Sequence, residues 1–212
     1  MFWFLLRRYF GKSAFLFLGI EYFDTIKTKD GLIYKVSPMG LGDVASSLTD
    51  YDFGGIQKTD IVLDIGGGVG GFALPAARKA KWVYVLEPLF GSNLEENLLI
   101  NQIENVTIFP FALGDGSNIM VEYSNNKKTI KSVTFPKLVE MCGDHIDFLK
   151  CDCEGGEWLI KPEMMTGIRR LEFELHNTKN KDPLFLKSLV HLGVQIKENP
   201  GPNDFAYSLV HG

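Results

Sequence analysis

The sequence predicts an α/β protein whose doubly wound, mostly parallel sheet carries helices on both faces. Three observations predict it: short apolar runs alternate with helical segments from residue 60 onward, a glycine-rich loop follows the first run, and two extended segments joined by a turn close the chain. Alternating β and α elements with short connections are typical of parallel sheets. The closing strand–turn–strand adds one antiparallel strand at or near an edge of the sheet.

Length and composition indicate a single globular domain. The 212 residues suit one α/β domain at 51–212 with a short extension at 1–50, and 45% of them are hydrophobic. Lys plus Arg number 22 against 26 Asp plus Glu, a net charge of −4. A nucleic-acid partner is not expected, because the clustered basic excess of such proteins is missing, although the composition leaves a local basic groove open. Three cysteines without zinc or disulfide spacing indicate free thiols in a reducing cytoplasm, so a cytoplasmic location is expected.

The extension begins with an apolar stretch, residues 1–20, which Arg7, Arg8 and Lys12 divide into runs too short to cross a bilayer. We therefore expect no transmembrane segment and one or two amphipathic helices folded onto the domain, with docking to a membrane surface or a partner as the alternative. Further on, Asp30-Gly31 between alternating apolar and polar residues predicts a β-hairpin.

The remaining elements follow from hydrophobic periodicity and turn residues. The predicted helices are a short piece at 43–53 and segments at 71–80, 92–103 (with Ser92 or Asn93 as its cap), 134–142 and 182–193. The predicted extended segments are 61–65, 81–88, 105–113, 116–124 (followed by a polar turn at 125–128), 145–160 in its first half, 168–176, 193–198 and 205–212.

The glycine-rich loop "DIGGGVGG" follows the strand at 61–65. Gly66, Gly67, Gly68 and Gly70 remove side chains where backbone would approach a ligand beside a helix N-terminus. The spacing fits both a nicotinamide dinucleotide and S-adenosylmethionine. Asp64 favours the second, because a carboxylate there suits a cationic amino group and sulfonium better than a pyrophosphate.

Glu87 ends the second strand of the repeat, 23 residues beyond Asp64. An acidic residue here accepts hydrogen bonds from ribose hydroxyls in dinucleotide-binding folds. Glu87, with Pro88 beside it, therefore indicates an adenosine-bearing ligand.

A second group of polar residues lies in "DFLKCDCEGGEW", 147–158. On a strand Lys150, Asp152 and Glu154 would share one face, near the carboxyl end of the sheet where α/β proteins bind ligands. A structural Lys150–Asp152 ion pair is the alternative. The next strand ends with Glu174 and His176, and His176 suits either a general base or an orienting group. Asp152, Glu174 and His176 would also suit a divalent cation, so whether a metal binds stays open.

The glycine loop, "VYVLEP", "FPFALGD", "KCDCEGGEW" and "LEFELHN" together resemble an FkbM-type methyltransferase, a family of class I S-adenosylmethionine-dependent enzymes, over roughly residues 50 to 178. That family often has an Asn in the loop, where this chain has Gly67 and Gly68. The resemblance implies a Rossmann-like sheet of seven strands in the order 3-2-1-4-5-7-6 with the last strand antiparallel. It also implies O-methylation of a sugar or polyketide-like small molecule.

By the same resemblance, Glu87 holds the ribose, the loop from Gly66 to Gly70 holds the methionine end, and Ala112 and Leu113 lie along the adenine. Asp152, Glu154 and His176 are the expected catalytic residues. Two alternatives stay open: an NAD(P)-dependent oxidoreductase and a non-catalytic S-adenosylmethionine-binding protein. The methyl acceptor and the oligomeric state are undetermined by the sequence.

Overall fold

The computed structural model describes residues 23–36, 38–123, 126–176, 194–198 and 207–211, and within them seven strands form one central sheet in the order β11-β12-β10-β9-β3-β4-β5. The strands are β3 (Ile61–Ile65), β4 (Trp82–Leu86), β5 (Val106–Phe109), β9 (Phe148–Cys151), β10 (Arg170–Leu175), β11 (Val194–Glu198) and β12 (Tyr207–His211). Neighbours from β10 to β5 are parallel, whereas β12 is antiparallel to both β10 and β11. Numbered by position in the chain, the order is 3-2-1-4-5-7-6.

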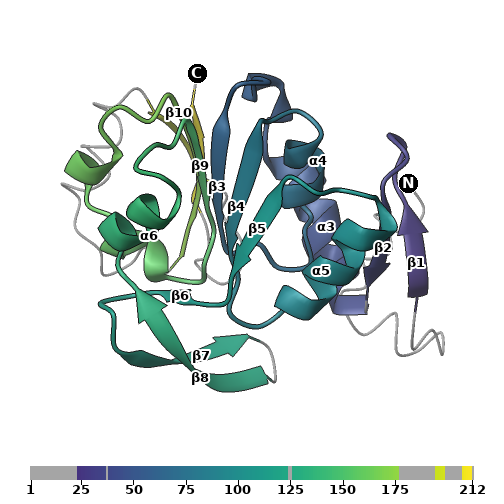
Figure 1. Ribbon diagram of the computed structural model, residues 1–212, viewed down its shortest axis with the longest axis horizontal. Helices are drawn as coiled ribbons and strands as arrows, with labels where there is room; N and C mark the ends of the chain where they lie inside the picture. Colours follow the sequence, from purple (N-terminus) through teal and green to yellow (C-terminus); the bar gives the residue numbers. More distant parts are fainter. Residues whose placement is uncertain (1–22, 37, 124–125, 177–193, 199–206, 212) are drawn as a thin grey trace.

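Helices cover both faces of this sheet (Figure 1). One side carries α3 (Pro38–Asp50), α4 (Ala73–Ala77) and α5 (Gly91–Ile100), and the other carries α6 (Phe135–Met141). Short 3₁₀ helices span Phe53–Gly55, Gly156–Leu159 and Pro162–Met165. The predicted α/β class, with a mostly parallel sheet between two helical layers, is confirmed.

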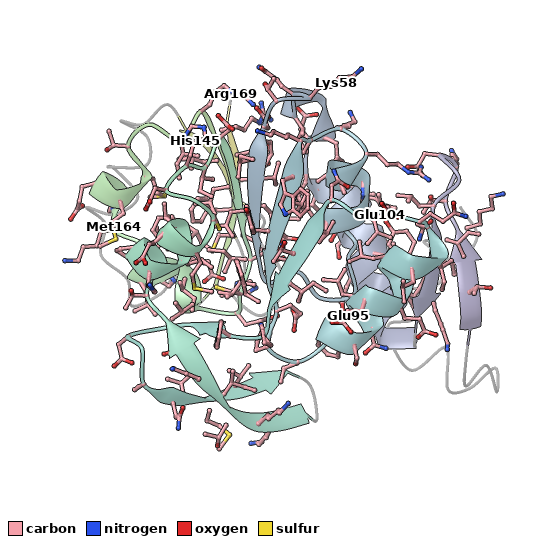
Figure 2. The ribbon with its side chains drawn as sticks, viewed as in Figure 1. Lys58, Glu95, Glu104, His145, Met164 and Arg169 are labelled. Carbon is pink, nitrogen blue, oxygen red and sulfur yellow. The ribbon has the colours of Figure 1, made fainter. Side chains whose placement is uncertain are left out.

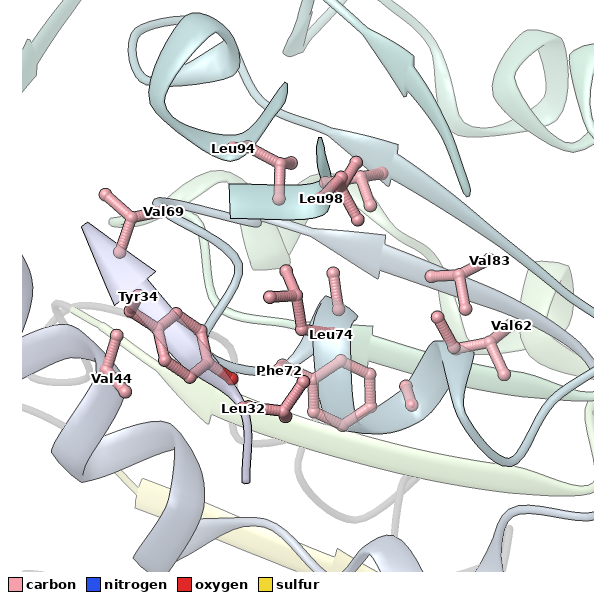
Figure 3. Close-up of a cluster of buried hydrophobic side chains, with 14 of the residues drawn as sticks. Leu32, Tyr34, Val44, Val62, Val69, Phe72, Leu74, Val83, Leu94 and Leu98 are labelled. Carbon is pink, nitrogen blue, oxygen red and sulfur yellow. The ribbon is translucent and has the colours of Figure 1, made fainter. Parts of the chain in front are cut away.

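Two apolar clusters fill the layers, and strand β3 contributes to both because alternate side chains point to opposite faces. Val62 packs with Phe72 and Leu74 in the cluster of Figure 3, whereas Leu63 belongs to the cluster beneath α6. Each fully buried side chain of this size stabilises the fold by about 1.5–3 kcal/mol. The two clusters fix β3 at the centre, and with it the loop that follows β3.

The predicted hairpin at Asp30-Gly31 is confirmed: β1 (Phe23–Lys27) pairs antiparallel with β2 (Ile33–Val36). Gly31 has a positive φ of 87°, which explains the need for glycine in the turn. Asn97 of α5 accepts the Lys35 N–H at 2.7 Å and donates to the Val69 carbonyl at 2.9 Å. This buried amide therefore ties the hairpin to the glycine loop.

The predicted helices within 1–20 and at 182–193 fall outside the described residues. In the part of the chain that is described, no helix has the length and apolar character to cross a membrane.

The strand predicted at 105–113 is wrong in its second half. β5 ends at Phe109, and Pro110, which lacks the N–H that a ladder requires, interrupts the pairing. Ala112–Leu113 forms β6, which joins β8 (Asn126–Val133) and β7 (Asn118–Tyr123) in a second, three-stranded sheet. The polar turn predicted at 125–128 is wrong for Lys127 and Lys128, which lie within β8.

The predicted capping of the helix at 92–103 by Ser92 or Asn93 is also wrong. α5 begins one residue earlier, at Gly91, and no side chain caps it at Phe90. Instead, Glu87 accepts the N–H groups of Leu89 and Phe90 at 2.6 and 2.9 Å. The turn before α5 is therefore held by Glu87, the residue that follows β4.

Candidate active site

The site lies at the carboxyl ends of the parallel strands. Lys58, His145 and Arg169 precede β3, β9 and β10 and lie at one edge of the molecule in Figure 2, so these strands end at the opposite edge, beside the β7–β8 hairpin. A cavity of about 480 Å³ opens there. It is lined by residues of α3, the glycine loop, the end of β4, β6, β7 and the ends of β9 and β10. Parallel α/β sheets bind ligands at this edge.

The glycine loop lines one wall of the cavity through Gly66, Gly67 and Gly68, whereas Gly70 lies outside the lining. Position 66 requires glycine because of the packing of the backbone, independently of any ligand: a Cβ there would lie 1.7 Å from the Asp152 carbonyl oxygen. At Gly68, whose φ is +53°, a Cβ would meet nothing within 4 Å. Of these two glycines, only Gly68 leaves open space for a ligand to approach the backbone.

Glu87 lines the same wall together with Pro88, Ala112 and Leu113. Its carboxylate accepts three backbone N–H groups, from Gly68 at 2.7 Å and from Leu89 and Phe90. A carboxylate has about four acceptor positions, so one remains for a ligand hydroxyl. Burial raises the pKa of Glu87, and the three N–H groups oppose that effect.

Asp64 does not line the cavity. It is fully buried, and its Oδ1 lies 3.1 Å from Nζ of Lys150. Burial raises the pKa of Asp64, while the Lys150 ammonium opposes this. Lys150 Nζ also donates to the Gly66 carbonyl at 2.8 Å and lies 3.8 Å from Asp152 Oδ2. Asp64 thus acts on the site through Lys150, rather than facing a ligand as its place in the sequence predicted.

The adjoining wall is acidic and has a histidine at its centre. His176 Nε2 lies 3.9 Å from Asp152 Oδ1, 3.7 Å from Glu154 Oε2 and 3.8 Å from Glu174 Oε1. All four side chains line the cavity. The expected catalytic residues Asp152, Glu154 and His176 are therefore brought together, although β9 ends at Cys151 and strand alternation does not extend to Glu154.

The pKa of His176 lies above the near-neutral value that a general base requires. Burial disfavours the charged imidazole, but the hydrogen bond to Glu157 and the neighbouring carboxylates outweigh it and raise the pKa of His176 to about 9. In the structure as described, the imidazole is protonated at neutral pH, and a protonated imidazole cannot accept a proton. Burial and the charge of Asp152 raise the pKa of Glu174 to about 7.

Sequence reasoning assigned no role to two residues of the site, Tyr51 and Glu157. The Tyr51 hydroxyl donates to Asp152 Oδ2 at 3.0 Å, and Lys150 Nζ lies 5.4 Å from the centre of its ring. Glu157 is fully buried, accepts the Cys153 N–H at 2.7 Å and lies 3.1 Å from His176 Nδ1. The repeated acidic residues in "CDCEGGEW" are a sequence pattern from which Glu157 could have been predicted as part of the site. No sequence pattern marks Tyr51.

The two cysteines near the site, Cys151 and Cys153, are free, as predicted. β9 ends at Cys151, and the chain turns so that Cys153 Sγ lies 3.8 Å from Cys151 Sγ. Burial raises the pKa of Cys151.

No protein-family model matches this sequence, and neither does any curated protein. Solved structures of similar fold include a rRNA methylase from Streptococcus thermophilus, with a TM-score of 0.51 and 12% identity over 81% of this chain and 92% of that one. A putative transferase, PH0793 from Pyrococcus horikoshii, has a TM-score of 0.51 and 13% identity over 97% and 82% of the two chains.

TYW2 of M. jannaschii, solved in complex with AdoMet, has a TM-score of 0.50 and 14% identity over 88% of this chain and 82% of that one. At these identities the likeness establishes the fold alone. The chain has the Rossmann-like fold of class I S-adenosylmethionine-dependent methyltransferases.

Proposed function

We propose that the chain is an S-adenosylmethionine-dependent methyltransferase of the FkbM type, which transfers a methyl group to a hydroxyl oxygen of a small molecule. One observation carries the proposal. A single cavity is lined both by the glycine loop with Glu87 and by the adjoining cluster of Asp152, Glu154 and His176. Such an arrangement holds a cofactor and an acceptor against each other, which is what group transfer requires.

The charge of the cavity favours S-adenosylmethionine over a dinucleotide. Five acidic residues line it against two basic ones, Lys150 and His176; the acidic ones are Asp43, Glu87, Asp152, Glu154 and Glu174. Lys150 is already bound to Asp64 and the Gly66 carbonyl. A pyrophosphate would be repelled here, whereas a sulfonium and an ammonium would be stabilised.

In the proposed complex the ribose hydroxyls bind the remaining acceptor position of Glu87. The methionine end lies along Gly66 to Gly68, and the adenine lies against Ala112 and Leu113. Asp64 contributes by holding Lys150, which in turn fixes the Gly66 carbonyl and Asp152. The ligand's amino group then meets backbone carbonyls and the acidic wall rather than Asp64 itself.

The reaction is an in-line displacement. The acceptor oxygen forms the new bond to the methyl carbon, the sulfur–carbon bond breaks, and neutral S-adenosylhomocysteine leaves with the electron pair. An alcohol is a weak nucleophile until its proton departs. Asp152 and Glu154 are placed to receive that proton, and His176 orients the acceptor from the buried side.

The acceptor class follows from the family resemblance and the charge of the cavity. An acidic lining suits neutral or cationic hydroxyl compounds, such as sugars and polyketide-like alcohols, better than a polyphosphate chain. Ser46 and Ser47 of α3 also line the cavity and offer hydrogen bonds to a polyol.

The test is a methyl-transfer assay with labelled S-adenosylmethionine against sugars, polyols, hydroxylated polyketides, tRNA and rRNA. We expect transfer to a hydroxyl compound, and loss of turnover in Asp152→Asn and His176→Ala while S-adenosylhomocysteine affinity is retained. Transfer to RNA alone would overturn the small-molecule assignment. Cofactor binding without transfer to any class would favour the non-catalytic alternative, and full activity in both variants would refute the catalytic roles.

A further inference from the structure

We propose that His176, Asp152 and Glu174 bind a divalent cation of the Mg²⁺ or Mn²⁺ class inside the cavity. The inference deepens the proposed function, because the cation would hold and activate the acceptor hydroxyl. Its binding can nevertheless be measured without cofactor or acceptor.

The geometry converges on one atom, His176 Nε2. Carboxylate oxygens of Asp152, Glu154 and Glu174 lie 3.9, 3.7 and 3.8 Å from it. Adjacent ligands of an octahedral Mg²⁺ with bonds of about 2.1 Å are about 3 Å apart, so small side-chain rotations would close these groups around an ion. They extend from the ends of the adjacent strands β9 and β10, which place them at the carboxyl edge of the sheet.

The histidine is held as metal-binding histidines usually are. Its Nδ1 lies 3.1 Å from Oε1 of Glu157, which is fully buried. A carboxylate that accepts the Nδ1 proton fixes the ring. A cation that displaces the Nε2 proton to solvent would then take the Nε2 lone pair. The carbonyl of His176 is also held, since it accepts the Trp158 Nε1–H at 2.6 Å. Side chain and backbone are thus both fixed before any ligand arrives.

A second, independent observation is the state of Nε2. The His176 side chain is only 8% exposed, and it lines the cavity. Among the described residues, Nε2 makes no hydrogen bond, although Nδ1 does. The carboxylate oxygens nearest to Nε2 lie 3.7 to 3.9 Å away, beyond hydrogen-bond distance but near enough for a shared ion.

The charge balance points the same way. Four carboxylates surround the imidazole, those of Asp152, Glu154, Glu157 and Glu174. One ligand atom each from Asp152, Glu157 and His176 lie within 4.8 Å of one another, and Glu174, which is outside that set, would have to turn toward the ion. Lys150, the other nearby cation, is 3.1 Å from Asp64 but 3.8 Å from Asp152. The cluster therefore retains negative charge that a dication would neutralise.

Two or three carboxylates with one imidazole are donors that suit Mg²⁺ or Mn²⁺. A dication at Nε2 would coordinate the acceptor's hydroxyl oxygen and stabilise the alkoxide. The hydroxyl proton would pass to Glu154, which lies at the exposed side of the cluster. The oxygen–methyl bond would then form as the sulfur–methyl bond breaks.

The test uses Mn²⁺ alone as a probe, titrated into the full chain and followed by electron paramagnetic resonance. We expect one bound Mn²⁺ that Mg²⁺ displaces, and affinity at least about tenfold lower in Glu174→Gln and His176→Gln, the loss of roughly one ligand. Glu163→Gln, at an exposed position outside the cavity, is the matched control. Thermal denaturation checks that each variant is folded. If His176→Gln is not folded, the Mn²⁺ affinity of Glu174→Gln alone decides the test.

Absence of Mn²⁺ binding in the wild type would overturn the proposal, as would binding that both folded variants retain. S-adenosylhomocysteine is titrated separately by calorimetry. If it binds and Mn²⁺ does not, the cation site is refuted while the cofactor assignment stands. If Mn²⁺ binds and the cofactor product does not, the cation site stands and the methyltransferase assignment fails.

Discussion

Asp64 and Lys150, on the adjacent strands β3 and β9, form a buried ion pair. Oδ1 of Asp64 lies 3.1 Å from Nζ of Lys150, and both side chains are shielded from solvent. The pair lies directly beneath the glycine loop, because Lys150 also donates to the Gly66 carbonyl. Asp64 therefore acts on the site indirectly, by holding Lys150. The negative charge that faces the cavity comes from Glu87 and from the acidic residues at the ends of β9 and β10.

The first prediction concerns this pair. Lys150→Met leaves the Asp64 carboxylate buried without its partner, so we expect a loss of about 3–5 kcal/mol in the free energy of unfolding. Asp64→Leu combined with Lys150→Met should recover about half of the loss or more, because no unpaired charge remains. Chemical denaturation measures both. Lys58→Met, at an exposed site, is the control, and an equal loss there would contradict the account.

The second prediction concerns Glu87. Glu87→Gln keeps the size of the side chain but removes the charge and turns one acceptor into a donor. We expect S-adenosylhomocysteine to bind about tenfold or more weakly, since a hydrogen bond to a charged group contributes about 1.5–3 kcal/mol. Calorimetry on the folded variant gives the affinity. Glu95→Gln, on the exposed side of α5, should bind like the wild type. Unchanged affinity in Glu87→Gln would remove Glu87 from the cofactor site.

The third prediction separates the glycines. Gly66→Ala should not fold, because its Cβ would overlap the Asp152 carbonyl. Gly68→Ala should fold with a loss of about 1 kcal/mol from its positive φ and should weaken S-adenosylhomocysteine binding. Gly143→Ala is the control for backbone strain, with a φ of +87° and open space around it. Equal affinity of Gly68→Ala and Gly143→Ala for S-adenosylhomocysteine would remove Gly68 from the cofactor site.

The fourth prediction is a pH dependence of stability. Asp147 is partly buried, which alone would raise its pKa, but the N–H of Ile61 and the imidazole of His145 lower the pKa of Asp147 overall. A lowered folded pKa stabilises the protein above the unfolded value of about 3.9, and this contribution is lost as the pH falls through the folded pKa.

Asp147→Asn should therefore be less stable than the wild type near pH 7, by about 1 kcal/mol, and the difference should shrink toward about pH 3. Urea denaturation across this range measures it. Asp144→Asn removes the same charge at an exposed residue whose positive φ asparagine tolerates. A difference from the wild type that does not change with pH would contradict the assignment.

Much of the fold could be predicted, because its signals are local. The strand before the glycine loop, the hairpin at Asp30-Gly31 and the antiparallel strand near the end of the chain each follow from short patterns. The second sheet could not be predicted, since Ala112 pairs with Ser132 across a long separation and only Pro110 marks the break.

The residues of the candidate site could largely be predicted from the sequence, but the contacts between their side chains could not. Asp152, Glu154 and His176 come together because β9 and β10 are adjacent, which the α/β alternation implies. That Lys150 is closer to Asp64 than to Asp152 depends on which side chains the packing buries. The contact of Tyr51 with Asp152 joins residues 101 positions apart, and no sequence pattern encodes it.

The proposed function depends on the binding of S-adenosylmethionine in the cavity beside the glycine loop. Isothermal titration calorimetry of the wild-type chain with S-adenosylhomocysteine and with NAD⁺ tests it most directly. We expect one binding site for S-adenosylhomocysteine, with lower affinity in Glu87→Gln and Gly68→Ala, and no heat of binding from NAD⁺. Binding of NAD⁺ with none of S-adenosylhomocysteine would contradict it and return the chain to the dinucleotide-binding class.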